Sequence, residues 1–260
     1  MKISIIGAGN MGGAVACGLA VGGSVSPKDI TVIDHKGKNV ERLKAFCEKL
    51  NVVIADYSSL SESDIVIVAV KPWMIEDVLT THKSLLNAKQ LVASVASGIT
   101  LDQLREWTNP DQPVFRIMPN TAISVCQSMT YIASRGASEN QIQQVCEIFA
   151  ALGKAEQVDE KLFPAITSLT SCGIAFAFRY IRAAMEGGIE MGIYPEQAKN
   201  AVLQTLRGAI ELLEANGTHP EAEIDKVTTA GGITIKGLNE MEHAGFTSSV
   251  IKGLKASNVK

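Results

Sequence analysis

Short apolar runs rich in β-branched residues recur along the first half of the chain, and stretches with helical spacing separate most of them. Such runs, bounded by turn-forming residues, predict buried strands. Residues 65–70 are apolar on both faces, as a central strand of a parallel sheet must be. The predicted strands are 3–6, 30–33, 52–54, 65–70, 91–95 and 114–118, with helices over 10–20 and 40–50. This alternation predicts an α/β domain with a parallel sheet and right-handed crossovers.

The pattern changes near residue 155, where helical spacing replaces the alternation. A last strand is predicted at 156–158. The helices predicted beyond it are 162–191, broken around Ser171-Cys172-Gly173, then 195–215 and 235–243. Pro195 stands near a helix start, where proline is favoured. We therefore expect two domains, a dinucleotide-binding domain over 1–159 and an all-helical substrate and dimerisation domain over 160–260.

A glycine-rich turn, Gly7-Ala8-Gly9-Asn10-Met11-Gly12, follows the first predicted strand and opens the first predicted helix. In that context the Gly-x-Gly-x-x-Gly spacing predicts a Rossmann-type site for a nicotinamide dinucleotide. The three glycines allow a tight turn, close approach of the pyrophosphate to the backbone, and close helix packing. The alternative is a tight turn without a ligand. The residues of this segment assigned to the cofactor are Ile6, Gly7, Ala8, Gly9, Asn10 and Met11.

The residues after the second predicted strand bear on which cofactor is used. Asp34 can hold a ribose 2′-hydroxyl and repel a 2′-phosphate, which favours NADH. His35, Lys36 and Lys38 follow at once and can instead receive that phosphate, which favours NADPH. The carboxylate tips the expectation toward NADH, and NADPH stays open. A solvated loop is the alternative for the basic cluster.

Four further segments carry a family signal. They are Ala69-Val70-Lys71-Pro72, Ser94-Val95-Ala96-Ser97-Gly98-Ile99-Thr100, Arg116-Ile117-Met118-Pro119-Asn120-Thr121 and Val227-Thr228-Thr229-Ala230-Gly231-Gly232-Ile233-Thr234. With the glycine turn they resemble pyrroline-5-carboxylate reductase, from Ile6 to Glu242. The last segment is the most specific, because it combines hydroxyl residues, a Gly-Gly pair and a threonine.

The resemblance implies reduction of the cyclic imine 1-pyrroline-5-carboxylate to L-proline with NADPH or NADH. It places Thr234 against the ring nitrogen, as the catalytic contact, and Thr229 against the carboxylate. Gly231 and Gly232 can bring backbone N–H groups close to that carboxylate. Lys226 is a further candidate to face it, with an exposed helix position as the alternative. The alternative is that the two threonines before the glycines cap a helix and the Gly-Gly pair is only a turn.

The resemblance also extends the cofactor site along the ends of the later strands. Ligands of such sheets bind beyond the carboxyl ends of the strands, which agrees with these positions. The residues assigned are Ala69, Val70, Lys71, Pro72, Ala96 and Asn120. A plain turn at Lys71-Pro72 and an Asx-turn at Asn120 are the alternatives. Glu160 is a candidate to reach the cofactor from the domain junction, with an exposed helix position as the alternative.

This chain departs from the family pattern in two places. Ala230 stands where most relatives have proline, so the loop is less preorganised. Thr170-Ser171-Cys172-Gly173-Ile174-Ala175 stands where relatives usually have Ser-Gly-Ser-Gly-Pro-Ala. Gly173 and Ala175 are kept and the proline is lost, which makes the substrate preference less certain than the fold. We expect Cys172 to be a small buried residue rather than a nucleophile.

Composition narrows the classes of function. The formal net charge is −3 and the lysines are scattered, so no nucleic-acid partner is expected. The five cysteines are an odd number without Cys-x-x-Cys spacing, and the histidines form no paired motif, so neither a disulfide framework nor a metal site is expected. No signal peptide and no long uncharged apolar run are recognised. We expect a cytoplasmic protein with no membrane partner.

Two helical segments of the C-terminal half, 163–166 and 174–178, are apolar on more than one face. A helix that is apolar all round must be buried. We expect these faces to pack against a second subunit, as in the interlocked dimers of the family, which also assemble into decamers.

Two rival functions remain. A related two-domain hydroxyacid dehydrogenase usually carries a catalytic lysine on the first long helix after the sheet, and residues 168–192 contain none. A non-catalytic nicotinamide-binding paralogue is expected to lose Thr234 or the Gly-Gly pair, and this chain keeps them.

Overall fold

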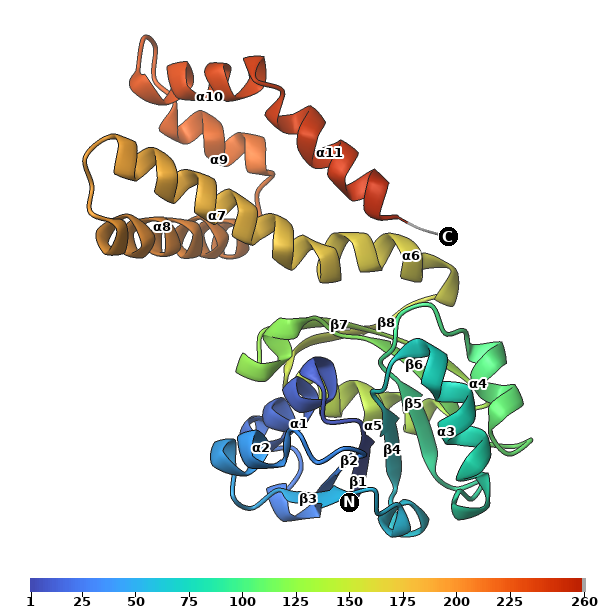
Figure 1. Ribbon diagram of the computed structural model, residues 1–260. Coiled ribbons are helices and arrows are strands. Elements are labelled where there is room, and N and C mark those ends of the chain that lie inside the picture. Colours follow the sequence, from blue (N-terminus) through green and yellow to red (C-terminus); the bar gives the residue numbers. More distant parts are fainter. Residues whose placement is uncertain (259–260) are drawn as a thin grey trace. The chain divides into compact units, whose positions relative to one another are not determined.

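The computed structural model describes residues 1–258 (Figure 1). Its internal contacts divide it into two compact units, Met1–Ser171 and the part that begins at Cys172. The first contains the sheet, and the second consists of helices joined by short turns. A Rossmann-type parallel-sheet domain followed by a helical region confirms the predicted fold class.

The sheet of the N-terminal unit has the order β3-β2-β1-β4-β5-β6-β7-β8. Its strands are β1 (Ile3–Ile6), β2 (Ile30–Asp34), β3 (Asn51–Ile54), β4 (Ile65–Val68), β5 (Leu91–Ser94), β6 (Val114–Met118), β7 (Ser128–Arg135) and β8 (Gly153–Gln157). β1 lies between β2 and β4, with Ile5 paired to Val32 on one side and to Ile67 on the other. The loop after β1 therefore lies between the loops that follow β2 and β4.

Helices cover both faces of this sheet, because alternate strand residues point to opposite sides. Ile5 and Ile67 pack in one cluster with α1, α2 and α5. Val66 and Val68 pack in the other cluster with α3 and α4. Figure 1 shows both layers. These helices are α1 (Asn10–Gly22), α2 (Val40–Phe46), α3 (Ile75–Thr81), α4 (Leu101–Trp107) and α5 (Glu139–Ala150).

One strand was not predicted. β7 runs antiparallel to β6, with Ala133 opposite Arg116, whereas the neighbouring pairs along the rest of the sheet are parallel. Its connection from β6 is a short 3-10 turn, Thr121–Val125, closed by Cys126 in the left-handed conformation with φ 55°. Such a short connection can only reverse the chain, because a parallel pair needs a crossover of a dozen residues or more.

The C-terminal unit consists of α7 (Cys172–Glu190), α8 (Pro195–Asn216), α9 (Pro220–Val227), α10 (Ile233–His243) and α11 (Phe246–Ser257). Pro195 occupies the first position of α8, and Gly217 ends that helix in the left-handed conformation. α9 and α11 were not predicted as helices. The predicted break around residue 171 is a π-helical segment, Thr167–Ser171, that follows α6 (Phe163–Ile166) and leads directly into α7.

A continuous helical run spans Glu160–Glu190 and is long and apolar enough, by length and composition alone, to cross a membrane. Only 11% of its most apolar window is buried within one chain. A helix that packs against another subunit shows the same combination, so this finding bears on the oligomeric interface considered below.

Candidate functional site

A cleft of about 600 Å³ lies beyond the carboxyl ends of β1, β2, β4 and β5. Eleven of the predicted cofactor residues line it: Gly7, Ala8, Gly9, Asn10, Met11, Asp34, Ala69, Val70, Lys71, Pro72 and Ala96. His35, Lys36 and Lys38 line it as well. Residues 34–39 and residues 69–74 border the cleft, with the glycine turn between them because β1 lies between β2 and β4.

The three glycines of the turn are needed for different reasons. Gly7 has φ +106°, and a Cβ there would lie 2.8 Å from the carbonyl oxygen of Ala69. A Cβ on Gly12 would overlap the carbonyl oxygen of Gly7. Gly9 differs, because a Cβ on it would meet nothing within 4 Å and would project into open space at the start of α1. This open space beside unpaired helix N–H groups fits a pyrophosphate.

Asp34 is buried at 7% exposure and bonds to its own loop. One carboxylate oxygen accepts a hydrogen bond from the Lys36 amide at 3.2 Å. The other accepts from the Asn39 amide at 2.7 Å and from the Asn39 side chain at 3.2 Å. Gly37 adopts φ +70° between them. The carboxylate therefore fixes the turn that carries the basic residues.

Arg42 was missed by the sequence analysis. Its guanidinium donates to the carbonyl oxygen of Ala8 at 2.9 Å and, at 3.4 Å, to that of Gly9. These bonds tie α2 to the back of the glycine turn and place a positive charge beside it. The basic run before Arg42 was visible in the sequence, but only the packing of α2 against α1 brings this side chain to the turn.

Two predicted cofactor residues lie outside the cleft lining. Ile6 is 2% exposed and belongs to the apolar core beneath the turn. Asn120 is 6% exposed, and its side-chain oxygen accepts from the Ala122 amide at 3.0 Å, which is the Asx-turn arrangement. Its amide nitrogen donates to the carbonyl oxygen of Thr170 at 3.3 Å. Asn120 thus ties the end of β6 to the π-helical segment.

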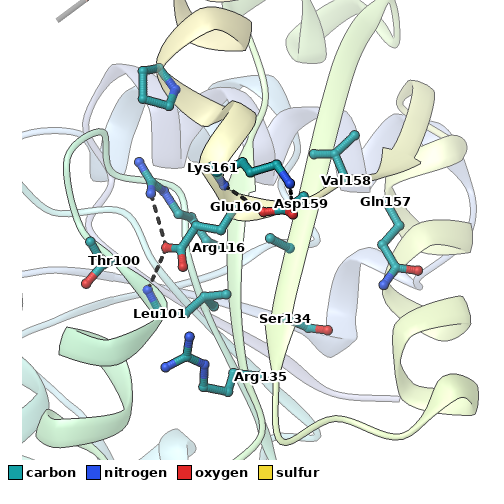
Figure 2. Close-up of a pocket in the computed structure, with 12 residues that line it drawn as sticks. Thr100, Leu101, Arg116, Ser134, Arg135, Gln157, Val158, Asp159, Glu160 and Lys161 are labelled. Carbon is teal, nitrogen blue, oxygen red and sulfur yellow. Dashed lines mark hydrogen bonds and ion pairs between the residues drawn. The ribbon is translucent and has the colours of Figure 1, made fainter. Parts of the chain in front are cut away.

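A second cavity, of about 620 Å³, contains Glu160 (Figure 2). One Glu160 oxygen accepts from Arg116 at 3.1 Å and from the Leu101 amide, at the start of α4, at 2.8 Å. The Arg116 guanidinium also lies 4.5 Å above the centre of the Phe163 ring. Glu160 therefore joins β6 to α4 at the start of the helical run, and it does not line the cofactor cleft.

The other charges around this second cavity are also paired. Lys161 contacts Asp159 at 2.7 Å, and Arg135 contacts Asp102. Hydrogen bonding to Lys161 lowers the pKa of Asp159. The Arg116 side chain is 9% exposed, and its Nε is buried without a hydrogen-bond partner while the ring of Phe163 lies against the guanidinium. The charges around this cavity therefore form a cluster of ion pairs.

The predicted substrate residues lie in the C-terminal unit, on the turn between α9 and α10. The Gly232 amide donates to the carbonyl oxygen of Thr229 at 2.9 Å, and Gly231 adopts φ +71°. Gly232 is the N-cap of α10, and Thr234 lies exposed in its first turn. A Cβ on Gly232 would lie 2.6 Å from the Thr229 hydroxyl oxygen, so a larger residue there would have to displace that hydroxyl. The turn therefore presents helix N–H groups and a hydroxyl together.

Lys226 pairs along its own helix. Its ammonium donates to Glu223 at 2.6 Å, and Glu223 also accepts from Thr218 and from Asn216. The bond from Lys226 is the largest cause of the lowered pKa of Glu223. In this conformation the Lys226 ammonium is paired within α9, and it would have to leave Glu223 to contact a substrate.

The cysteines have no disulfide partner within the described residues 1–258. Burial raises the pKa of the Cys17 and Cys146 thiols, which disfavours the reactive thiolate. Cys172 is partly buried at the start of α7.

Comparison with protein families gives two matches. Residues 160–260 match the pyrroline-5-carboxylate reductase dimerisation family. Residues 2–98 match the family described as NADP oxidoreductase, coenzyme F420-dependent.

Curated relatives cover the chain from end to end. Pyrroline-5-carboxylate reductase 1 of Dictyostelium discoideum is 39% identical over 99% of this chain, which spans about half (49%) of that relative's length. Pyrroline-5-carboxylate reductase 2 of the same organism is 34% identical over 100% of this chain and 91% of its own.

A solved structure has the same fold. Pyrroline carboxylate reductase of Plasmodium falciparum, with NADP bound, is 26% identical and has a TM-score of 0.90. The match covers 99% of this chain and 95% of that one.

Proposed function

Because the chain belongs to the pyrroline-5-carboxylate reductase family, we propose that it reduces 1-pyrroline-5-carboxylate to L-proline with NADPH or NADH, the last step of proline biosynthesis. The observation that carries the proposal is that one chain keeps both the glycine-turn cleft and the Gly231-Gly232-Ile233-Thr234 turn. The first defines a cofactor class that serves many reactions. The second resembles the signature of this family.

The residues of the cleft fit a nicotinamide dinucleotide. The start of α1 has no acidic side chain in its first turn, and Gly9 leaves open space in front of its N–H groups. Those groups would hold the pyrophosphate, and Ala96, which follows β5 and lines the cleft, would contact the nicotinamide half. When bound, the reduced cofactor supplies the hydride for the carbon of the C=N bond.

The turn before α10 is proposed to hold the substrate. The N–H groups at the start of α10 bind the carboxylate, with Thr229, Gly231 and Gly232 forming the loop around it. Thr234 is the catalytic contact, because its hydroxyl can hydrogen-bond the ring nitrogen whose protonation activates the imine. Lys226 can add a positive charge if it leaves Glu223. Catalysis on this scheme is mostly orientation of the imine.

A homodimer formed through the C-terminal unit is part of the proposal. The match to a dimerisation family over 160–260 and the exposed apolar side chains of α7 and α11 support it. It predicts a mass of at least twice 27.7 kDa by light scattering. Assembly of dimers into decamers and a cytoplasmic location remain further parts of the proposal, and the free cysteines support a reducing compartment.

The test is direct. Purified protein is mixed with 1-pyrroline-5-carboxylate and NADPH, then with NADH, and oxidation is followed by the loss of the near-ultraviolet absorbance of the reduced nicotinamide, with proline measured independently. We expect proline to form in proportion to the cofactor consumed. No turnover with either cofactor, by a protein shown to be folded and dimeric, would refute the proposed reaction.

A further inference from the structure

The role of Asp34 follows from how its carboxylate is used. Both oxygens accept hydrogen bonds from within residues 36–39, at 2.7–3.2 Å. Asp34 is also buried, with only 7% of the residue exposed. A carboxylate that reads a ribose diol must turn an oxygen toward the ligand. Here both oxygens already accept hydrogen bonds from the turn, so binding a diol would compete with the bonds that define it.

The turn held by Asp34 presents only basic charge to the cleft. His35, Lys36 and Lys38 line it, and no acidic residue other than Asp34 does. Arg42 adds a further positive charge through its bonds to the carbonyl oxygens of Ala8 and Gly9. A phosphate on the 2′-position carries a charge of about −1.5 to −2 near neutral pH, so this side of the cleft favours it.

We propose that Asp34 is a positioning residue for NADPH selectivity: it fixes the turn at residues 35–39 so that Lys36 and Lys38 bind the 2′-phosphate. This reverses the role expected from the sequence, where the carboxylate holds the 2′-hydroxyl and excludes the phosphate. The inference rests on the cofactor class of the proposed function, and it does not depend on the substrate being the imine.

The two roles give opposite results for Asp34→Asn. The probes are adenosine 2′,5′-bisphosphate and 5′-AMP, which differ only in the 2′-phosphate, and binding to the full-length protein is measured by titration calorimetry. We expect wild type to prefer the bisphosphate by about tenfold or more, as charge-assisted hydrogen bonds imply. Asp34→Asn should lose most of this preference and leave 5′-AMP binding unchanged. Tighter bisphosphate binding, or weaker 5′-AMP binding, in the variant would overturn the proposal.

A second variant tests the proposal even if Asp34→Asn misfolds. Lys36→Ala/Lys38→Ala leaves the carboxylate in place and removes the charges that it positions, so it should also lose the preference. Lys44→Ala removes an exposed lysine of α2 outside the cleft and should retain it. If the double variant keeps the wild-type preference, the proposal is wrong whatever Asp34→Asn does.

The outcome separates this inference from the proposed reaction. A protein that prefers the bisphosphate but does not reduce the imine supports the inference and refutes the reaction. A protein that reduces the imine but binds the two nucleotides equally refutes the inference alone. With turnover established, Asp34→Asn should raise the KM for NADPH much more than that for NADH, at similar kcat.

Discussion

The two units of this protein differ in how far they bury their apolar side chains. The N-terminal unit packs its large apolar residues into two cores, one on each face of the sheet. In the C-terminal unit, Ala198 is the one buried apolar side chain among the described residues. Phe178, Tyr194 and Ile233 are 64%, 76% and 87% exposed there. Both units have ordinary helix caps and regular helices, so the difference lies in packing.

Within a single chain, only the N-terminal unit buries most of its large apolar side chains. Soluble monomers rarely expose contiguous apolar patches of several hundred Å². A cavity of about 500 Å³ between α7 and α11, lined by Phe176, Tyr180 and Phe246 among others, marks where such a surface is concave. This surface supports the proposed homodimer, in which a second copy of the chain would cover it.

The largest effect is expected from a charge on the exposed face of α7. Phe178→Lys should raise the dimer dissociation constant at least about 100-fold, which is about 3 kcal/mol, because an unpaired ammonium would be buried in an apolar interface. Analytical ultracentrifugation measures the change. Val21→Lys is the matched control, since Val21 is 61% exposed on α1 of the N-terminal unit. Equal dimer dissociation constants for the two variants would show that the exposed face of α7 is not part of the dimer interface.

Breaking the Glu160–Arg116 pair should destabilise the N-terminal unit. Glu160→Ala leaves a guanidinium that is 9% exposed without its carboxylate, at a cost of about 3 kcal/mol. Urea denaturation followed by tryptophan fluorescence reports on this unit, which holds both Trp73 and Trp107. Glu62→Ala, which breaks an exposed pair with Lys2, should leave the curve unchanged. A similar loss in both variants would show that burial of the pair is not the cause.

Removing the Thr234 hydroxyl should slow the reaction without changing assembly or cofactor binding. Thr234→Ala is expected to lose about 1.5–3 kcal/mol of transition-state stabilisation in kcat/KM, if the hydroxyl touches a charged ring nitrogen. Thr247→Ala, on α11, is the control, because its hydroxyl bonds to Glu242 within the same unit. An unchanged rate in Thr234→Ala would show that the Thr234 hydroxyl does not contact the reacting ring.

Gly9→Ala should weaken cofactor binding while the protein folds normally. The added Cβ meets no protein atom within 4 Å, so it occupies the space assigned to the pyrophosphate. We expect the dissociation constant for NADPH to rise about tenfold or more, since a close backbone approach is blocked. Gly12→Ala is the contrast, because its Cβ would overlap the Gly7 carbonyl and lower the melting temperature as well. Normal NADPH affinity in Gly9→Ala would show that the pyrophosphate does not bind against Gly9.

The smallest effect is a pH dependence in the N-terminal unit. His82 stacks on Tyr57 with ring centres 3.7 Å apart, and burial lowers its pKa, while Asp77 acts in the opposite direction. The unfolded state then binds this proton more readily than the folded state. Stability should fall slightly as pH drops below about 6.5, the ordinary histidine value. His82→Gln should flatten this part of the urea midpoint profile. An identical profile in wild type and variant would exclude His82.

The sequence alone determined the features that depend on local pattern. Apolar periodicity located the six strands before β7 and the long helix α8, because strand and helix repeats differ. The glycine spacing located the cleft, because a tight turn with close backbone approaches tolerates few other residues. β7 was missed because its buried positions include Ser128 and Thr130, so it lacks the continuous apolar run of the earlier strands.

Only the tertiary structure decided which partner each polar group takes. Asp34 was expected to face a ribose, and it holds its own turn because Asn39 folds back onto it. Glu160 was a candidate for the cofactor, and it pairs with Arg116 because β6 lies beside the start of the helical run. A hydrogen bond depends on two positions that are adjacent in space, often far apart in the chain. The sequence shows which groups need hydrogen-bond partners, and the fold determines which partners lie close enough to bind them.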